Sequence, residues 1–159
     1  MIFIALVHDF IVLSNRDNMS LNDIQRNKKG LIDTKKSRIE DYVWIEDSLF
    51  LYMQDSFKWI PTGYNEKGFG FNYDGLTYIN HEGATVFRNV VESWISLFSN
   101  APERFILRGL YSEDHETGVG DYIRDEYIKI HVLEKLERLK RYIKKIEEDT
   151  NLHILHLGI

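Results

Sequence analysis

The stretch Gly68-Phe-Gly-Phe-Asn-Tyr-Asp-Gly-Leu-Thr-Tyr-Ile79 gives the strongest local indication of the fold. The pair Asp74-Gly75 is typical of a two-residue type I′ turn, the turn that joins the strands of a tight β-hairpin. The residues on either side of this pair alternate in size and polarity, as a half-buried sheet requires. The stretch therefore predicts a hairpin with strands at 68–73 and 76–79.

Two segments further along the chain change to the helical period. In the first segment, apolar residues recur at i, i+3, i+4, i+7, i+8 and i+11 from Phe87, which predicts an amphipathic helix at about 84–99. In the second segment, the apolar series from Leu133 to Ile146 predicts another amphipathic helix at about 132–149, with charged side chains outside.

The rest of the chain contains short β-branched and aromatic runs separated by turn formers. Strands are predicted at 2–7, 10–13, 42–45, 48–53, 57–60, 105–111 and 152–157. The pair His8-Asp9 makes the first two runs either one strand with a bulge or two short strands, and Glu46-Asp47 is read as a turn. Residues 112–121 are read as a loop. Residues 127–130 fit a strand or the first helical turn, and the strand is favoured.

These elements predict an α+β fold: an antiparallel sheet of five or more strands with the two main helices (84–99 and 132–149) packed on one face. A chain of 159 residues fits a single domain over residues 1–159. Within it, residues 14–41 form a long polar connection, with Ser20 as a candidate N-cap for a short helix. Connections of this length are typical of functional or mobile segments.

Composition narrows the function classes. The chain has no cysteine, which excludes disulfides, thiolate zinc sites, iron–sulfur clusters and a cysteine nucleophile. No apolar run approaches the 18 or so residues of a membrane span, and the apolar N-terminus lacks the basic start of a signal peptide. We therefore expect a cytoplasmic protein that does not engage a membrane.

The net charge of −5 is unevenly distributed along the chain. Between Arg16 and Arg38 there are seven basic and three acidic residues, whereas between Glu40 and Glu126 there are sixteen acidic and six basic residues. An acidic middle region argues against nucleic-acid binding, for which a basic footprint supplies most of the affinity. It favours a basic protein as the partner.

No catalytic pattern is present. His153 and His156 are three residues apart, so on a strand they point to opposite faces and cannot share a metal ion. His81-Glu82 begins like a zinc-protease signature, but no second histidine follows at helical spacing. The glycines at 68, 70 and 75 match no nucleotide-binding pattern, and no Gly-x-Ser-x-Gly elbow occurs. We expect no enzyme, no metal and no cofactor.

The acidic residues of segment 113–126 are the candidate partner-binding site. Carboxylates held together can occupy the anion-binding cleft of a nuclease, where substrate phosphates would otherwise lie. The candidate contact residues are Glu113, Asp114, Glu116, Asp121, Asp125 and Glu126. The alternative interpretation is a solvated loop with no binding role.

A resemblance adds to these observations. The residues Gly75-Leu-Thr-Tyr-Ile-Asn80, Phe87, Trp94-Ile-Ser-Leu-Phe98, Ala101-Pro-Glu103, Phe105 and Gly109, with the terminal Ile154-Leu-His-Leu-Gly-Ile159, resemble bacterial polymorphic-toxin immunity proteins. The matched positions lie within about residues 68–111 and the last few residues. The resemblance implies a non-enzymatic inhibitor that binds one cognate toxin, often a nuclease, and it assigns no site residues. Two alternatives stay open: a small metal-dependent hydrolase, and an adaptor subunit of a larger assembly.

Overall fold

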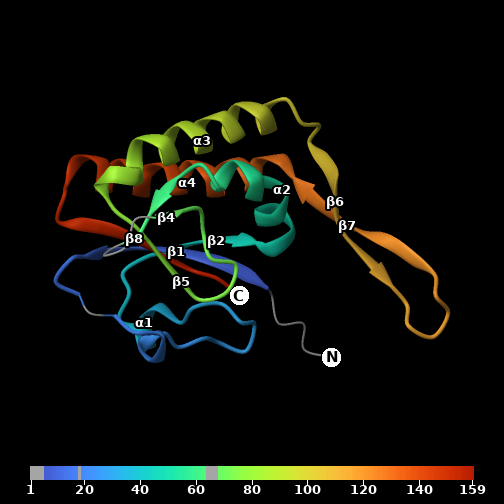
Figure 1. Cartoon of the computed structure of the whole chain (residues 1–159), viewed down its shortest axis with the longest axis horizontal. Helices are drawn as coiled ribbons and strands as arrows, with labels where there is room; N and C mark the ends of the chain where they lie inside the picture. The colour runs from blue at the N-terminus through green and yellow to red at the C-terminus, as the bar shows by residue number, and fades with distance from the viewer. Residues whose placement is uncertain (1–5, 18, 64–67) are drawn as a thin grey trace.

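The computed structural model of the chain describes residues 6–17, 19–63 and 68–159, and it confirms the α+β class. Its main sheet has four strands, not five or more: β1 (Val7–Ser14), β2 (Val43–Glu46), β5 (Leu76–Ile79) and β8 (Leu152–Leu157). The order is β2-β1-β8-β5, and every neighbouring pair is antiparallel (Figure 1). The last strand of the chain therefore lies inside the sheet, between the first strand and β5.

Two further sheets contain two strands each. β3 (Pro61–Thr62) pairs with β4 (Gly68–Phe69), and β6 (Arg104–Glu113) pairs with β7 (Gly120–Ile128). The helical elements are η1 (Leu21–Asp23), α1 (Thr34–Ser37), α2 (Asp47–Phe57), α3 (His81–Ser99) and α4 (Lys129–Glu148). The two helices predicted from apolar periodicity are thus present as α3 and α4, and Ser20 directly precedes η1 as expected.

The predicted hairpin at 68–79 is wrong. Asp74 and Gly75 do form a turn with a positive φ of 85° at the glycine, but β5 pairs with β8 and β4 pairs with β3. The amide of Asn72 donates to the Thr77 hydroxyl, and the Asn72 side chain donates to the Leu76 carbonyl, so side-chain hydrogen bonds hold this turn. β5 belongs to the main sheet and β4 to a separate two-stranded sheet, so the turn connects strands of different sheets.

The strand predicted at 48–53 is also wrong, because these residues belong to helix α2. The buried side chains Leu49, Phe50, Met53 and Phe57 share one helical face, while Tyr52 on the outer side is exposed. The run Ser48-Leu-Phe-Leu-Tyr-Met53 is too short for periodicity to separate a strand from a buried helix. Consequently Glu46-Asp47 is a strand-to-helix junction.

Two further predictions, for the start of the chain and for residues 57–60, also differ from the structure. β1 is one continuous strand that includes His8 and Asp9, and its predicted residues 2–5 lie outside the described part of the chain. Residues 57–60 do not continue the sheet, because Phe57 ends α2, and the amides of Trp59 and Ile60 bond back to Ser56 and Phe57. Pro61, the next residue, opens β3.

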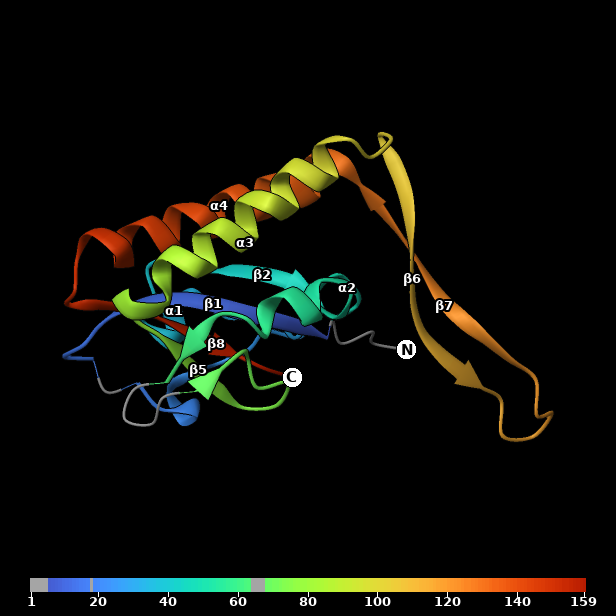
Figure 2. The ribbon, with the colours of Figure 1, turned by 45° about the horizontal axis from the view of Figure 1, so that its top comes forward.

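The sheet has a core on each face. On the first face, Phe10, Val43, Ile79 and Ile154 pack with the buried side of α2, α3 and α4. α4 contacts β1, β2 and β8, and α3 lies along α4 (Figure 2). On the second face, Ile11, Leu13, Leu155 and Leu157 pack with Ile32 and Ile39. The polar connection 14–41 therefore supplies the side chains that cover the second face.

The largest change from expectation concerns residues 104–128. The predicted strand at 105–111 extends to Glu113, and β7 begins at Gly120. The predicted loop at 112–121 therefore includes the end of one strand and the start of the next. A second strand, β7, follows and ends at Ile128, so residues 127–130 are divided between β7 and the first turn of α4. Together β6 and β7 form a long hairpin, here called the arm.

Candidate partner-binding site

The arm projects from the rest of the molecule as a separate two-stranded sheet (Figures 1 and 2). Its register runs from Arg104 opposite Ile128 to Glu113 opposite Gly120, with a bulge between Arg108 and Tyr111. A β-bulge bends a strand and strengthens its twist. The bulge therefore divides the arm into a root, which is joined to the body, and a free outer half.

Aromatic contacts fix the root to the body. Phe105 stacks between Phe98 of α3 and Tyr127 of β7, with ring centroids 5.6 and 5.8 Å away respectively. Tyr127 is 6% exposed, and its hydroxyl shares a hydrogen bond with the Ser48 hydroxyl at the start of α2. Burial raises the pKa of Tyr127 to about 12, so this hydroxyl keeps its proton. Leu107 is the other buried side chain of the root.

The arm also exposes large apolar side chains: Ile106, Leu110, Tyr111, Val119, Tyr122 and Ile123 are between 41% and 71% exposed. A two-stranded ribbon has no second layer on which to bury such side chains. Exposed apolar groups gathered on one element are typical of a surface that binds a partner.

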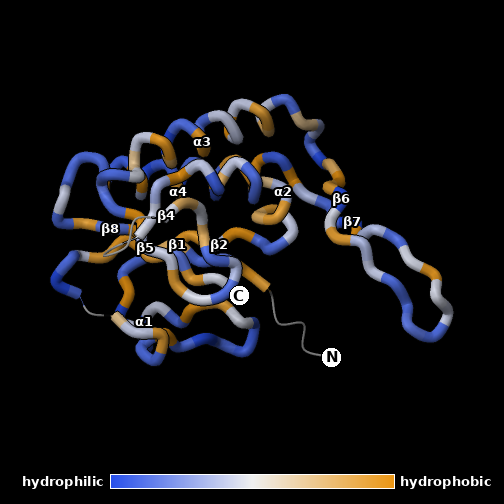
Figure 3. Tube along the Cα trace, in the orientation of Figure 1, coloured by the Kyte–Doolittle hydropathy of each residue, from blue (hydrophilic) through white to orange (hydrophobic). Residues whose placement is uncertain are grey.

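The end of the arm carries four of the six predicted acidic residues. Glu113, Asp114, Glu116 and Asp121 are all exposed, and none of them makes an ion pair with a described residue. This region is hydrophilic in Figure 3. We call these four residues the acidic tip.

Asp114 differs from the other three residues of the acidic tip because it also holds the turn. Its carboxylate accepts hydrogen bonds from the amides of Glu116 and Thr117 at 2.8 and 2.9 Å. These bonds lower the pKa of Asp114. The Gly118 amide donates to the Asp114 carbonyl, and Gly118 has a φ of +68°. Asp114 therefore carries a charge and also stabilises the turn, whereas Glu113 and Glu116 contribute charge without holding the turn.

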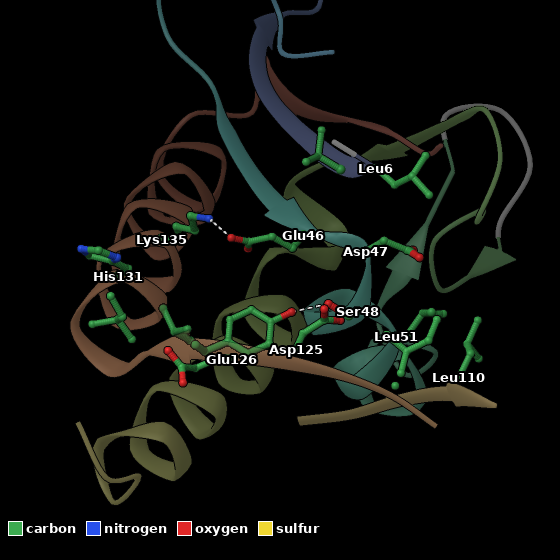
Figure 4. Close-up of a pocket in the computed structure, with 16 residues that line it drawn as sticks. Leu6, Glu46, Asp47, Ser48, Leu51, Leu110, Asp125, Glu126, His131 and Lys135 are labelled. Carbon is green, nitrogen blue, oxygen red and sulfur yellow. Dashed lines mark hydrogen bonds and ion pairs between the residues drawn. The ribbon is translucent and has the colours of Figure 1, made fainter. Parts of the chain in front are cut away.

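The other two predicted residues, Asp125 and Glu126, lie at the root and not at the tip. They line a groove of about 700 Å³ between the arm and the body (Figure 4). Glu126 is exposed and pairs with Arg104 across the strands at 3.0 Å. Asp125 is half-buried and has no cationic partner among the described residues. The structure thus divides the predicted acidic cluster into two separate places.

Both walls of this groove are apolar. The arm contributes Leu110 and Ile123, which are 57% and 48% exposed. The body contributes Leu6, which precedes β1 and is 56% exposed, and Leu51 of α2. The groove volume falls within the range of about 300–1,000 Å³ found for ligand pockets. An apolar groove with carboxylates on its walls favours a ligand that is both apolar and cationic.

Sequence reasoning missed two further carboxylates of the groove, Glu46 and Asp47. Glu46 accepts a hydrogen bond from Lys135 of α4 at 2.6 Å (Figure 4). The Lys135 ammonium also lies 3.5 Å from the centroid of the Trp44 ring. Burial lowers the pKa of Lys135. Recognising α2 would have placed both acids at a helix N-terminus, where negative charge is favoured.

Behind Asp47, two histidines form a buried chain. His8 Nε2 lies 3.1 Å from the Asp47 carboxylate, and His8 Nδ1 lies 3.0 Å from His156 Nε2. A carboxylate only accepts, so His8 Nε2 carries its proton and His8 Nδ1 accepts from His156. Burial lowers the pKa of both rings. The His8 ring also stacks on Phe50 at 3.7 Å, so its two nitrogens and one ring face are occupied inside the core.

The expected separation of the C-terminal histidines is confirmed. His156 contacts Phe10 and Phe71 on the first face of the sheet, whereas His153 lies near Tyr78 and bonds Asn15 on the second face. In the part of the chain that the structure describes, no three histidine, aspartate or glutamate side chains are placed to hold a metal ion. None of the described helices is both long and apolar enough to cross a membrane.

Comparison of the chain with protein-family models, with curated proteins and with solved structures finds no match in any of the three. The arm, its acidic tip and the groove at its root are therefore the features of the molecule that point to a function.

Proposed function

We propose that the chain is a cytoplasmic immunity protein that binds a cognate bacterial toxin and neutralises it by occlusion. The observation that carries this proposal is the arm: a projecting two-stranded sheet with exposed apolar side chains and an acidic end. A projecting element can enter a cleft that a flat surface cannot reach. A toxin with a basic active-site cleft, such as a nuclease, fits this shape and charge.

Electrostatics supports a basic partner. The acidic tip carries four carboxylates at the end of the arm, with no lysine or arginine between Glu113 and Asp121. Charge complementarity of this kind speeds association and selects among partners more than it adds affinity. The acidic tip would therefore steer the arm toward a cationic cleft, and the exposed tyrosines Tyr111 and Tyr122 beside it would supply contact area.

The test starts with the toxin encoded beside this chain. Co-expression should protect cells from that toxin, and the two purified proteins should form a stable complex. If co-expression gave no protection and the two purified proteins formed no complex, the proposal would be contradicted.

Charge reversal then tests the arm. The double variant Glu113→Lys/Glu116→Lys should slow association by at least tenfold at low salt, because it replaces attraction by repulsion. The loss should shrink as ionic strength rises, since salt screens exposed charges. Asp114 is left unchanged because it holds the turn.

A matched control reverses the same number of charges away from the arm. Glu40 and Glu148 are exposed acidic residues on the body. The variant Glu40→Lys/Glu148→Lys has the same net charge as the tip variant but should keep the wild-type association rate within about twofold. If both variants slow association equally, net charge and not the arm accounts for the effect.

A further inference from the structure

The groove at the root of the arm contains a carboxylate that the fold leaves unpaired. Four carboxylates line it, and three have a partner: Glu46 with Lys135, Asp47 with His8, and Glu126 with Arg104. Asp125, the fourth, is half-buried and makes no ion pair with a described residue. Partial burial of a carboxylate is unfavourable unless a cation or hydrogen-bond donors compensate it.

Asp125 lies between apolar walls. It is on the same face of β7 as Ile123, because residues two apart on a strand share a face, and Leu110 lies on the neighbouring strand. Leu51 and Leu6 form the opposite, body wall. Contact of these walls with aliphatic side chains is favourable in proportion to the apolar area removed from water.

We propose that this groove binds a segment of the toxin in which an arginine is flanked by aliphatic residues. The guanidinium pairs with Asp125, and the flanking side chains lie between Leu110 and Ile123 on the arm and Leu51 on the body. This inference rests on the proposed function, because it names which part of the toxin the chain recognises. Arginine fits better than lysine, since its guanidinium is planar, bonds carboxylates with two parallel N–H groups and is weakly hydrated.

The groove and the acidic tip then have separate roles. The acidic tip is exposed and acts through long-range attraction, which changes the association rate. The groove excludes water from a charge pair, and loss of one partner of such a pair mainly speeds dissociation. Variants of the two places should therefore differ in which rate constant they change.

The groove is tested first without the toxin, by titrating the full chain with acetyl-Leu-Arg-Leu-amide and following amide chemical shifts by NMR. Saturable shifts are expected at Leu51, Leu110, Ile123 and Asp125. Acetyl-Leu-Gln-Leu-amide, which lacks only the charge, should bind roughly tenfold more weakly, as should the arginine peptide to Asp125→Asn. The variant Glu40→Gln removes an exposed carboxylate of the body that lies outside both the groove and the acidic tip, and it should leave peptide affinity unchanged.

The toxin complex gives the second measurement. Asp125→Asn and Leu110→Ser should each raise the dissociation rate roughly tenfold, while the association rate stays within about twofold. Both positions are at least partly exposed, and an unchanged melting temperature shows that the variants fold.

The outcomes separate the two proposals. If the toxin binds and both groove variants keep the wild-type dissociation rate, the groove proposal is overturned and the proposed function stands. If no toxin binds but the arginine peptide shows the expected selectivity, the proposed function fails, and the groove remains a site for such a segment of another protein. Equal affinity for both peptides overturns the groove proposal when no toxin binds. Self-association of the chain that Asp125→Asn abolishes also overturns it, because the groove would then be an interface between two copies of this chain.

Discussion

The aromatic core of the body and the outer part of the arm differ in how far they bury large apolar side chains. In the body, Phe10 and Phe87 are fully buried within a network of aromatic contacts, with Phe71 5.7 and 5.3 Å from them. In the arm, Leu110 and Ile123 are about half exposed. The aromatic cluster around Phe10 therefore stabilises the fold, whereas the apolar side chains of the outer arm are available for a partner.

Two ion pairs, one in the body and one in the arm, differ in the same way in their burial. Asp9 is fully buried in β1 and pairs with Arg26 of the 14–41 connection at 2.7 Å. Glu126 of the arm pairs with Arg104 at 3.0 Å, but both side chains are about 60% exposed. The two pairs have similar distances but contribute unequally to stability, because exposed ion pairs contribute about 0–1 kcal/mol. These pairs offer direct ways to test the comparison.

The largest expected effect comes from the aromatic core. Phe10→Ala should lower the free energy of unfolding by about 3–5 kcal/mol, because it removes a buried ring and leaves a cavity. Ile123→Ala on the arm should lower it by no more than about 0.5 kcal/mol, as is usual for exposed positions. Urea denaturation measures both values. A loss above about 2 kcal/mol for Ile123→Ala would show that the arm packs on the body.

A smaller effect is expected from the two ion pairs. Arg26→Met leaves the Asp9 carboxylate buried without its cation, which should cost about 2 kcal/mol at pH 7.5. Arg104→Met leaves Glu126 in solvent and should cost less than about 0.5 kcal/mol. Burial raises the pKa of Asp9 to about 6 even with Arg26 present, so the loss in Arg26→Met should shrink when unfolding is measured at pH 5. Equal losses for the two variants would contradict the division between body and arm.

The sequence predicted the parts of the fold that have long, regular patterns. The helices at 84–99 and 132–149 were predicted because their apolar stripes extend over several turns, and the strand at 152–157 because β-branched and aliphatic residues are concentrated there. The main sheet was expected to be larger because Ser48–Met53 was read as a strand, and because the strand at 105–111, which pairs with β7 in a separate sheet, was counted in it. A six-residue apolar run has too few repeats to distinguish the two periods, and only tertiary packing decides it.

The candidate site was predicted in part. The acidic residues at 113–126 were found from charge alone, but their division between the acidic tip and the groove depends on β7, which was not predicted. Arg124-Asp-Glu126 in the middle of β7 is unfavourable by strand propensity, which hid the strand. The carboxylates Glu46 and Asp47 could not be placed in the groove from sequence, because their neighbours there are about 80 residues away in the chain.

The smallest predicted effect concerns pH and the buried histidines. Burial lowers the pKa of His8, His153 and His156, so below pH 6.5 the unfolded chain binds protons that the folded chain does not. Stability therefore falls as the pH drops from 7.5 to 6, by about 0.8 kcal/mol for each histidine that stays neutral in the fold. Asp9 acts in the opposite direction, because its raised pKa makes the folded chain take up a proton near pH 6.

Comparing variants isolates the histidine contribution, since Asp9 is present in all of them. His156→Gln keeps a side-chain N–H that can donate to His8 but removes one titrating ring, so its stability should fall less between pH 7.5 and 6 than that of the wild type. His115→Gln makes the same substitution at an exposed position at the end of the arm, outside the buried body, and serves as the matched control. Thermal unfolding at the two pH values measures this. If His115→Gln flattened the pH dependence as much as His156→Gln, burial in the body would not be its cause.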